Sequence, residues 1–354
     1  MTEASAADES PHSLFRLWSD YRPTPLLALP ELARRCGVGA VLVKDEGQRP
    51  LGSFKVLGGM YAGLRALARS ANVPTIAALV AQKRVGPRLP TLICASDGNH
   101  GLAVAAGAEM AGAPARVYLH TGVPRSRALR ISDRGAEIVW ITGSYDDAVD
   151  AAFRAVERGE GLLISDTSPH ADDPVTADVM RGYGLMADEI TEQLQARNEP
   201  PPTHLFVQAG VGGIAAALGR GLCETHGHKC RVVVVEPASV DCVGAALRRG
   251  RIERLPGDLH TAAEMLSCGE ASAPAIAILQ RLRADAISVG EQELVDAVNL
   301  STAFGGPATT PSGATGLAGF MSALPGTLRA EELQLDSRSR ILWVATEGPI
   351  PEAR

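Results

Sequence analysis

Short apolar runs alternate with longer alanine-rich segments along most of this 354-residue chain. The runs are rich in Val, Ile and Leu and have the length of buried strands; they cover residues 40–43, 91–94, 115–119, 137–141, 162–164, 204–207, 231–235 and 341–344. Segments of helical period lie between them, at residues 56–68, 101–112, 126–135, 144–159, 175–198, 214–226 and 290–304. Near-continuous apolar strands separated by helices are typical of parallel sheets covered on both faces. The pattern therefore predicts an α/β fold.

The placement of the strands predicts two sheets. Six of the eight predicted strands fall within residues 91–235, and polar loops lie at residues 165–174 and 196–203. We expect two open, twisted, mostly parallel sheets flanked by helices, with a cleft between a larger and a smaller domain. Residues 1–60 and 175–354 are assigned to the larger domain and residues 61–174 to the smaller one.

Composition and charge exclude several classes of protein. The chain is 45% apolar and 21% charged, which argues against a disordered or fibrous protein, and its net charge of −6 provides no basic field for nucleic acid. No apolar stretch approaches the length of about 18 residues that a membrane span needs, and the amino terminus is polar and acidic rather than leader-like. Six cysteines are too few for a disulfide scaffold. We therefore expect a cytoplasmic protein with neither nucleic-acid nor membrane partners.

Lys55 lies in the first segment that carries chemistry, between Phe54 and Val56 at a predicted turn-to-helix junction. One interpretation is a surface lysine that opens a helix. The other is a lysine whose apolar neighbours desolvate the ammonium and lower its pKa, so that the amine forms an imine with an aldehyde. The segment alone leaves both open.

The second segment is Ser96-Asp97-Gly98-Asn99-His100-Gly101, between a predicted strand and an alanine-rich helix. Backbone N–H groups at such a helix start suit a carboxylate. The alternative is a helix cap made by Asp97 or Asn99, with glycine as a turn residue.

A glycine loop is the third segment and runs from Gly210 through Val211 and Gly212 to Gly213, again between a strand and a helix. This order places a phosphate on the N–H groups of a helix start. Because the G-x-G-x-x-G spacing is incomplete and no Walker lysine follows, dinucleotide and nucleoside-triphosphate binding are disfavoured.

An imine-forming lysine, a carboxylate site and a cradle for one phosphate are together what pyridoxal phosphate chemistry requires. The sequence resembles the fold type II pyridoxal-phosphate enzymes of the tryptophan synthase β and threonine dehydratase group, and within it the diaminopropionate ammonia-lyases. The resemblance covers about residues 21–348. It is carried by Arg22-Pro23-Thr24-Pro25-Leu26, Val43-Lys44-Asp45-Glu46, Ser53-Phe54-Lys55-Val56-Leu57-Gly58-Gly59, Asp97-Gly98-Asn99-His100-Gly101, Ser165-Asp166-Thr167, the loop 210–213, Val235-Glu236-Pro237, Pro311-Ser312-Gly313-Ala314 and Ala345-Thr346-Glu347-Gly348.

The resemblance implies a role for each matching position. Lys55 would hold pyridoxal 5'-phosphate as an internal aldimine, Asn99 would bond its phenolic oxygen, and Thr346 would face its pyridine nitrogen. The phosphate would lie on Gly210, Val211, Gly212 and Gly213. The substrate-binding positions would be Ser96, Asp97, Gly98, His100 and Ser312.

The implied reaction is the α,β-elimination of 2,3-diaminopropionate to pyruvate and ammonia, through an external aldimine and aminoacrylate. Lys55 would take the Cα proton of an L substrate and Asp97 that of a D substrate, whereas Asp166 would bind or protonate the departing amine. An Asp97 that only caps the following helix is the alternative.

Other functions within the same fold remain open at this point. A serine, threonine or hydroxyaspartate dehydratase and a β-replacement synthase fit the same cofactor site, although Asp97 is unusual for a dehydratase. The chain departs from the lyase pattern at residues 168–174 and at Pro311. A non-catalytic, regulatory relative is disfavoured because every cofactor position is intact.

The resemblance also implies a homodimer and a cysteine pair, Cys242 and Cys268, which would form a disulfide or remain as free thiols. Four cysteines and histidines that could bind a metal lie close together in the sequence, but their spacing matches no standard zinc site, so no metal is expected. That group is Cys223, His226, His228 and Cys230. The residues from Glu347 onward are expected to form a loop or tail.

Overall fold

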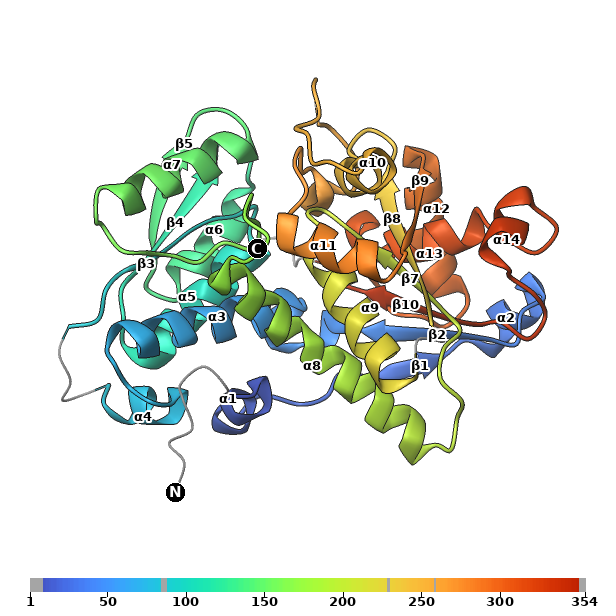
Figure 1. Ribbon diagram of the computed structural model, residues 1–354, viewed down its shortest axis with the longest axis horizontal. Helices are drawn as coiled ribbons and strands as arrows, with labels where there is room; N and C mark the ends of the chain where they lie inside the picture. The colour runs from blue at the N-terminus through green and yellow to red at the C-terminus, as the bar shows by residue number, and fades with distance from the viewer. Residues whose placement is uncertain (1–8, 84–87, 228–229, 258, 350–354) are drawn as a thin grey trace.

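Two α/β halves lie side by side in the computed structural model, which describes residues 9–83, 88–227, 230–257 and 259–349 (Figure 1). The strands are β1 (Leu26–Ala28), β2 (Ala40–Asp45), β3 (Leu92–Ala95), β4 (Ala115–His120), β5 (Glu137–Ile141), β6 (Leu162–Leu163), β7 (His204–Gln208), β8 (Arg231–Pro237), β9 (Asp285–Val289) and β10 (Arg340–Ala345). The α-helices are α1 (Pro11–Leu17), α2 (Pro30–Cys36), α3 (Lys55–Ser70), α4 (Ile76–Ala81), α5 (Asn99–Ala111), α6 (Arg125–Ser132), α7 (Tyr145–Glu157), α8 (Pro174–Ala196), α9 (Gly213–Thr225), α10 (Cys242–Arg249), α11 (Ala273–Arg281), α12 (Glu291–Ala303), α13 (Pro311–Met321) and α14 (Leu328–Leu333). Short 3-10 helices are η2 (Glu46–Gln48), η3 (Pro50–Gly52) and η4 (Glu264–Leu266).

The strands form two sheets, as the sequence predicts. The larger sheet has the order β1-β2-β10-β7-β8-β9 and the smaller one the order β5-β4-β3-β6. Every pairing is parallel except that of β1 with β2. All eight predicted strands are present, and the α/β fold with two mostly parallel sheets is confirmed.

Two strands at the edges of the larger sheet are additional to the prediction. The first, β1, has only three residues, and the second, β9, has four of its five residues partly exposed. Neither therefore has the continuous apolar run of a buried parallel strand. The smaller sheet lies wholly within residues 61–174, but the domain boundaries assigned from the sequence remain a prediction.

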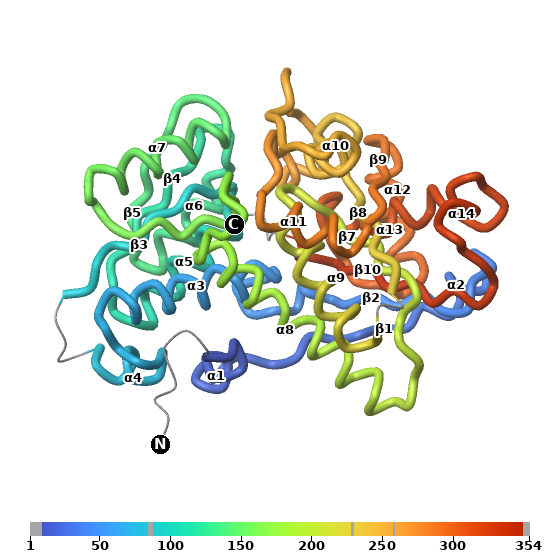
Figure 2. Tube along the Cα trace, viewed as in Figure 1, coloured from blue at the N-terminus to red at the C-terminus, as the bar shows by residue number. Residues whose placement is uncertain are grey.

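Helix α8 crosses from one half of the molecule to the other and packs against both α3 and α9 (Figures 1 and 2). Its contact with α3 is close because glycines face each other: a Cβ on Gly58 would clash with the ring of Tyr183, and one on Gly182 with the carbonyl of Leu57. The close approach brings Tyr183 and Phe54 together, with ring centroids 4.8 Å apart. These helices therefore hold the start of α3, where Lys55 lies, against the middle of α8.

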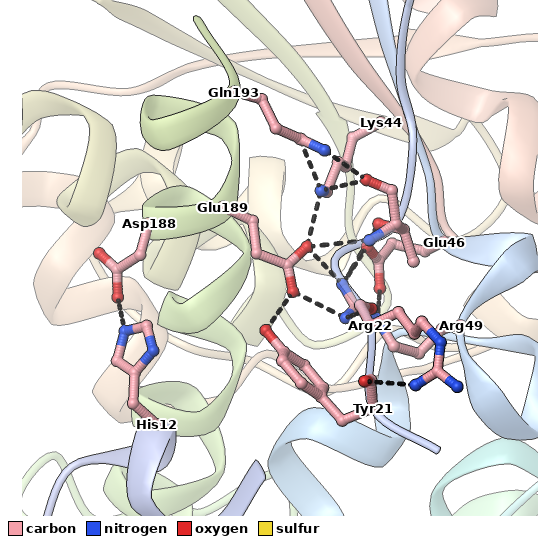
Figure 3. Close-up of polar contacts among 10 residues, drawn as sticks. His12, Tyr21, Arg22, Lys44, Glu46, Arg49, Asp188, Glu189 and Gln193 are labelled. Atoms are coloured by element: carbon pink, nitrogen blue, oxygen red, sulfur yellow. Dashed lines mark hydrogen bonds and ion pairs between the residues drawn. The ribbon is translucent and has the colours of Figure 1, made fainter. Parts of the chain in front are cut away.

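A buried ion cluster fixes α8 to β2 and η2; its members are Lys44, Glu46, Arg49 and Glu189 (Figure 3). Glu189 Oε2 lies 2.6 Å from Lys44 Nζ, and Glu189 Oε1 lies 2.7 Å from Arg49 Nη1. The other carboxylate, Glu46, accepts from Arg49 Nε at 2.8 Å and from Arg49 Nη2 at 2.7 Å. Two cations thus meet two carboxylates away from solvent, which is the arrangement that buried charge requires.

Helices of the described residues are all too short or too polar to cross a membrane.

Candidate active site

A pocket between the two sheets collects every site residue predicted from the sequence. It is lined by Lys55, Ser96, Asp97, Gly98, Asn99, His100, Asp166, Gly210, Val211, Gly212, Gly213, Ser312 and Thr346. Most of them lie just beyond the carboxyl end of a strand: β3 for the Ser96 segment, β6 for Asp166, β7 for the glycine loop and β10 for Thr346. Open parallel sheets bind ligands at this end of their strands.

Lys55 is the first residue of α3, and its Nζ forms an ion pair with the carboxylate of Asp166. Burial by itself lowers the pKa of Lys55, but Asp166 and Tyr183 raise it, so that the pKa lies above the usual value for lysine. Burial likewise raises the pKa of Asp166, yet Lys55 and His100 bring it down to about 2. Burial alone would shift the Lys55 pKa as the desolvation interpretation expects, but a carboxylate 111 positions away along the chain stabilises the ammonium and reverses the direction.

The segment between β3 and α5 is held by Ser96. Its Oγ accepts hydrogen bonds from Gly98 N at 2.9 Å and Gly101 N at 2.8 Å. Gly98 is the N-cap of α5, with φ of 141° that favours glycine, so the N-cap residue has no side chain and Ser96 Oγ accepts from the first turn instead. The alternative in which Asp97 or Asn99 only caps the helix is therefore wrong.

His100 faces the pocket from the first turn of α5. It is buried, and its Nε2 lies 2.8 Å from the carbonyl of Ile164. Because a carbonyl only accepts, Nε2 carries the hydrogen. Burial lowers the pKa of His100 and outweighs the opposing effect of Asp166.

Residues 210–213 fit a phosphate cradle. Gly212 is the N-cap of α9 with φ of 96°, so the loop turns in a left-handed conformation, and the first residues of α9 line the pocket. A Cβ on Gly210 would lie 3.1 Å from Cys268 Sγ, which leaves little room for any other residue there. Glycines, an N-terminal helix end and a neighbouring lysine together match the phosphate and aldehyde of pyridoxal phosphate.

Gln208 orients Thr346. Gln208 Nε2 donates to Thr346 Oγ1 at 2.9 Å, and it also contacts the carbonyls of Gly313 and Val344. Since Thr346 Oγ1 accepts this hydrogen bond, its own hydrogen remains to donate into the pocket. The hydroxyl thus suits an unprotonated ring nitrogen.

Glu347 is a pocket residue that the sequence interpretation assigned to a tail. It is 4% exposed, its Oε2 accepts from Asn99 Nδ2, and its Oε1 accepts from Thr310 Oγ1 at 2.6 Å. Burial raises the pKa of Glu347 despite these two donors. Its position directly after β10 and Thr346 is the signal that identifies it as part of the site.

Other lining residues had no role in cofactor or substrate binding assigned from the sequence; they are Phe54, Tyr145, Tyr183, Gln208, Ile214, Met265, Leu266 and Cys268. Most sit inside helices or loops without a local motif, so only the tertiary fold reveals them. Ser312, by contrast, was predicted and accepts from Met265 N at 3.1 Å, which leaves its hydrogen free to face a substrate.

All six cysteines are free thiols, so Cys242 and Cys268 do not form the disulfide that was one of the two alternatives. Cys242 Sγ instead donates to the carbonyl of Gly210 at 3.1 Å. His228 of the cysteine–histidine group lies outside the described residues. Among the residues that are described, no three His, Cys, Asp or Glu side chains are grouped to hold a metal ion.

The fold and pocket define a pyridoxal-phosphate enzyme, and comparison with known proteins agrees. Residues 17–347 match the pyridoxal-phosphate dependent enzyme family, and the chain belongs to that family. Its relatives include the diaminopropionate ammonia-lyases of Salmonella typhimurium, 33% identical over 347 residues, and of Escherichia coli K12, 31% identical over 346 residues. Each alignment covers 93% of this chain, with 86% and 85% of the relative, respectively.

Solved structures give the same result. The Escherichia coli diaminopropionate ammonia-lyase in complex with D-serine superposes with a TM-score of 0.85 and 29% identity, covering 98% of this chain and 90% of that one. The same enzyme with an aminoacrylate-PLP azomethine reaction intermediate gives a TM-score of 0.84 at 28% identity, covering 99% and 91%. These comparisons confirm the predicted resemblance and the predicted cofactor.

Proposed function

We propose that this chain catalyses the α,β-elimination of 2,3-diaminopropionate to pyruvate and two molecules of ammonia. The observation that carries the proposal is a single pocket lined by Lys55, Asp97 and Asp166 together with the glycine loop that fits a phosphate. The relatives that share most of the chain's length and bear the name diaminopropionate ammonia-lyase support the choice of substrate.

The cofactor site uses groups already oriented by the protein. Lys55 Nζ would hold the aldehyde carbon, the N–H groups of residues 210–213 the phosphate, and Thr346 Oγ1 the pyridine nitrogen. Asn99 has a second amide hydrogen besides the one given to Glu347, and this hydrogen would bond the phenolic oxygen. When bound, pyridoxal phosphate supplies an aldehyde for the substrate amine and an electron-withdrawing ring that acidifies the Cα proton.

The start of α5 would bind the substrate carboxylate. Ser96 Oγ already occupies the N–H groups of Gly98 and Gly101, so the N–H groups of Asn99 and His100 are the next donors in the first turn. Ser96 and Ser312 would each add a hydroxyl hydrogen. This arrangement would hold Cα beside the proton acceptors.

Proton transfer is assigned to groups on two different elements. Lys55 would remove the Cα proton of the L isomer and Asp97 that of the D isomer. Asp166, whose pKa of about 2 keeps it a carboxylate, is better suited to bind the β-ammonium of the substrate than to donate a proton. The same ammonium would compete with Lys55 for Asp166 and so release the lysine amine for proton transfer.

The test is turnover by protein loaded with pyridoxal phosphate, with D- and L-2,3-diaminopropionate and D- and L-serine supplied separately. We expect pyruvate and ammonia in a ratio of one to two from at least one diaminopropionate isomer, and slower turnover of serine. A serine dehydratase, the second candidate, is favoured by the departures at residues 168–174 and Pro311; it would give faster turnover of serine, with one ammonia per pyruvate. Absence of pyruvate from both diaminopropionate isomers rejects the proposal.

The attachment of the cofactor is tested separately. Borohydride reduction of the loaded protein should leave a mass tag on the peptide that contains Lys55, and Lys55→Ala should lose both the tag and the visible absorbance band. Tagging of another lysine would reject the assignment.

The cell compartment and the assembly belong to the same proposal. Six free thiols are compatible with a reducing cytoplasm, and the family resemblance favours a homodimer. Light scattering of the loaded protein at micromolar concentration tests the dimer; a monomer mass would reject it.

A further inference from the structure

His120 lies next to Asp97, outside the active-site pocket. Strands β3 and β4 are parallel neighbours with Ala95 opposite Tyr118, so the residues two positions further along, Asp97 and His120, also meet. His120 Nε2 lies 3.1 Å from Asp97 Oδ1, and the two side chains are 25% and 13% exposed. The sheet register therefore pairs the residue assigned to D-isomer deprotonation with an imidazole.

The other ring nitrogen of His120 fixes which side carries the hydrogen. Gly122 N donates to His120 Nδ1 at 3.1 Å, and a backbone N–H can only donate. The neutral imidazole therefore has its hydrogen on Nε2, the ring nitrogen that lies 3.1 Å from Asp97 Oδ1. Gly122 permits this bond, since a Cβ there would lie 2.7 Å from His120 Cε1 and 2.9 Å from His120 Nδ1.

A second cavity opens on the far side of the pair. Asp97 lines both the active-site pocket and this cavity, whereas His120 lines only the second one. The charged or titratable groups that share the second cavity with them are Arg127, Tyr145, Asp146, Asp147, Arg254, His260 and Glu264. The pairing with Asp97 raises the pKa of His120, while burial and Arg127 oppose it.

We propose that His120 is a positioning residue for Asp97: its imidazole, 3.1 Å from the carboxylate, holds Asp97 so that it faces Cα of the D isomer. This inference rests on the proposed function, because it assigns Asp97 to one stereoisomer. Lys55 reaches the pocket from α3 and does not depend on β4, so the L reaction has no need of His120. His120 thus sets the preference of the site between D and L substrates.

The kinetic test compares His120→Leu with His120→Gln. Leu removes the donor, and we expect kcat on D-2,3-diaminopropionate to fall about tenfold, with less than about twofold change on the L isomer. Gln restores an N–H donor without a titrating ring and should recover most of the D rate. In an Asp97→Asn background, His120→Leu should have no further effect. Equal losses on both isomers, or a Gln variant no better than Leu, would overturn the proposal.

A second measurement does not depend on turnover. The imidazole resonances of His120 are identified by their absence in His120→Gln, and their ¹⁵N shifts report the tautomer and the pH titration. We expect hydrogen on Nε2 and a lower pKa of His120 in Asp97→Asn than in the unmodified chain. A titration unchanged by Asp97→Asn, or hydrogen on Nδ1, would refute the pairing. If neither isomer is a substrate, the proposed function fails, but this measurement still decides whether His120 and Asp97 act together.

Discussion

The buried ion cluster gives a quantitative prediction about stability. Glu189→Gln removes one of two carboxylates that balance Lys44 and Arg49, and the side chains of all three residues are at most 2% exposed. Removing one partner of a buried ion pair costs about 3–5 kcal/mol, because the remaining charge stays desolvated. In this cluster two cations would share the single carboxylate of Glu46. We therefore expect Glu189→Gln to lower the free energy of unfolding by about 3–5 kcal/mol.

Asp188→Asn on the same helix is a matched control. Asp188 forms an ion pair with His12 at 3.0 Å, but the side chains are 51% and 41% exposed, so its loss should cost less than about 1 kcal/mol. Urea denaturation followed by far-UV circular dichroism measures both variants against the unmodified chain. Equal destabilisation by the two substitutions would refute the reasoning that burial sets the cost.

The sign of the pH dependence provides an independent check. Burial raises the pKa of Glu189, but Arg49 and Lys44 together lower it by a larger amount, so the pKa in the folded chain lies below that in the unfolded chain. The stability that this carboxylate contributes is therefore present above the unfolded pKa of about 4.3 and is lost as the pH falls through the folded pKa. Glu189→Gln should weaken the loss of stability with acid.

Three further predictions concern the larger sheet and its neighbours. Burial raises the pKa of Glu236 to about 8. The stability that this carboxyl contributes is therefore present below the unfolded pKa and is lost as the pH rises through about 8. Glu236→Gln should make the free energy of unfolding depend less on pH between about pH 5 and 9, and an unchanged pH dependence would contradict this. Gln208→Leu removes the donor to Thr346 and should raise the Kd for pyridoxal phosphate roughly tenfold in a spectroscopic titration, whereas the exposed Gln292→Leu should leave it unaltered. Gly58→Ala introduces a clash with α8 and should lower the free energy of unfolding by about 2–3 kcal/mol in urea; a variant as stable as the parent would show that the helices separate freely.

The fold was predictable where burial leaves a strong local pattern. Strand β8 contains the run Val232-Val233-Val234-Val235, whose side chains are all buried, so the apolar run and the strand coincide. Strand β9 lies at the edge of the same sheet with Asp285 and Ser288 among its residues, and its pattern resembles that of a loop. The difference between β8 and β9 comes from the position of β9 at the edge of the sheet, and a short stretch of sequence does not reveal that position.

The site was predictable where a motif lies between a strand and a helix. Lys55, the Ser96 segment and the glycine loop all have this context, and the structure brings them into one pocket. Tyr183 has no such context, since it reaches Phe54 and the pocket from the middle of α8 through close helix packing. The direction of the Lys55 pKa shift has a similar origin: it is set by Asp166 rather than by neighbours in sequence.

The strand order of the larger sheet has a consequence for synthesis on the ribosome. Strand β10 lies between β2 and β7, yet it is translated after every other strand of the described chain. A nascent polypeptide that ends before residue 340 therefore exposes two unpaired edges that face each other across a gap. Such a fragment already carries Lys55 and the glycine loop but lacks Thr346 and Glu347. The cofactor pocket therefore gains Thr346 and Glu347 only when this last strand has been inserted.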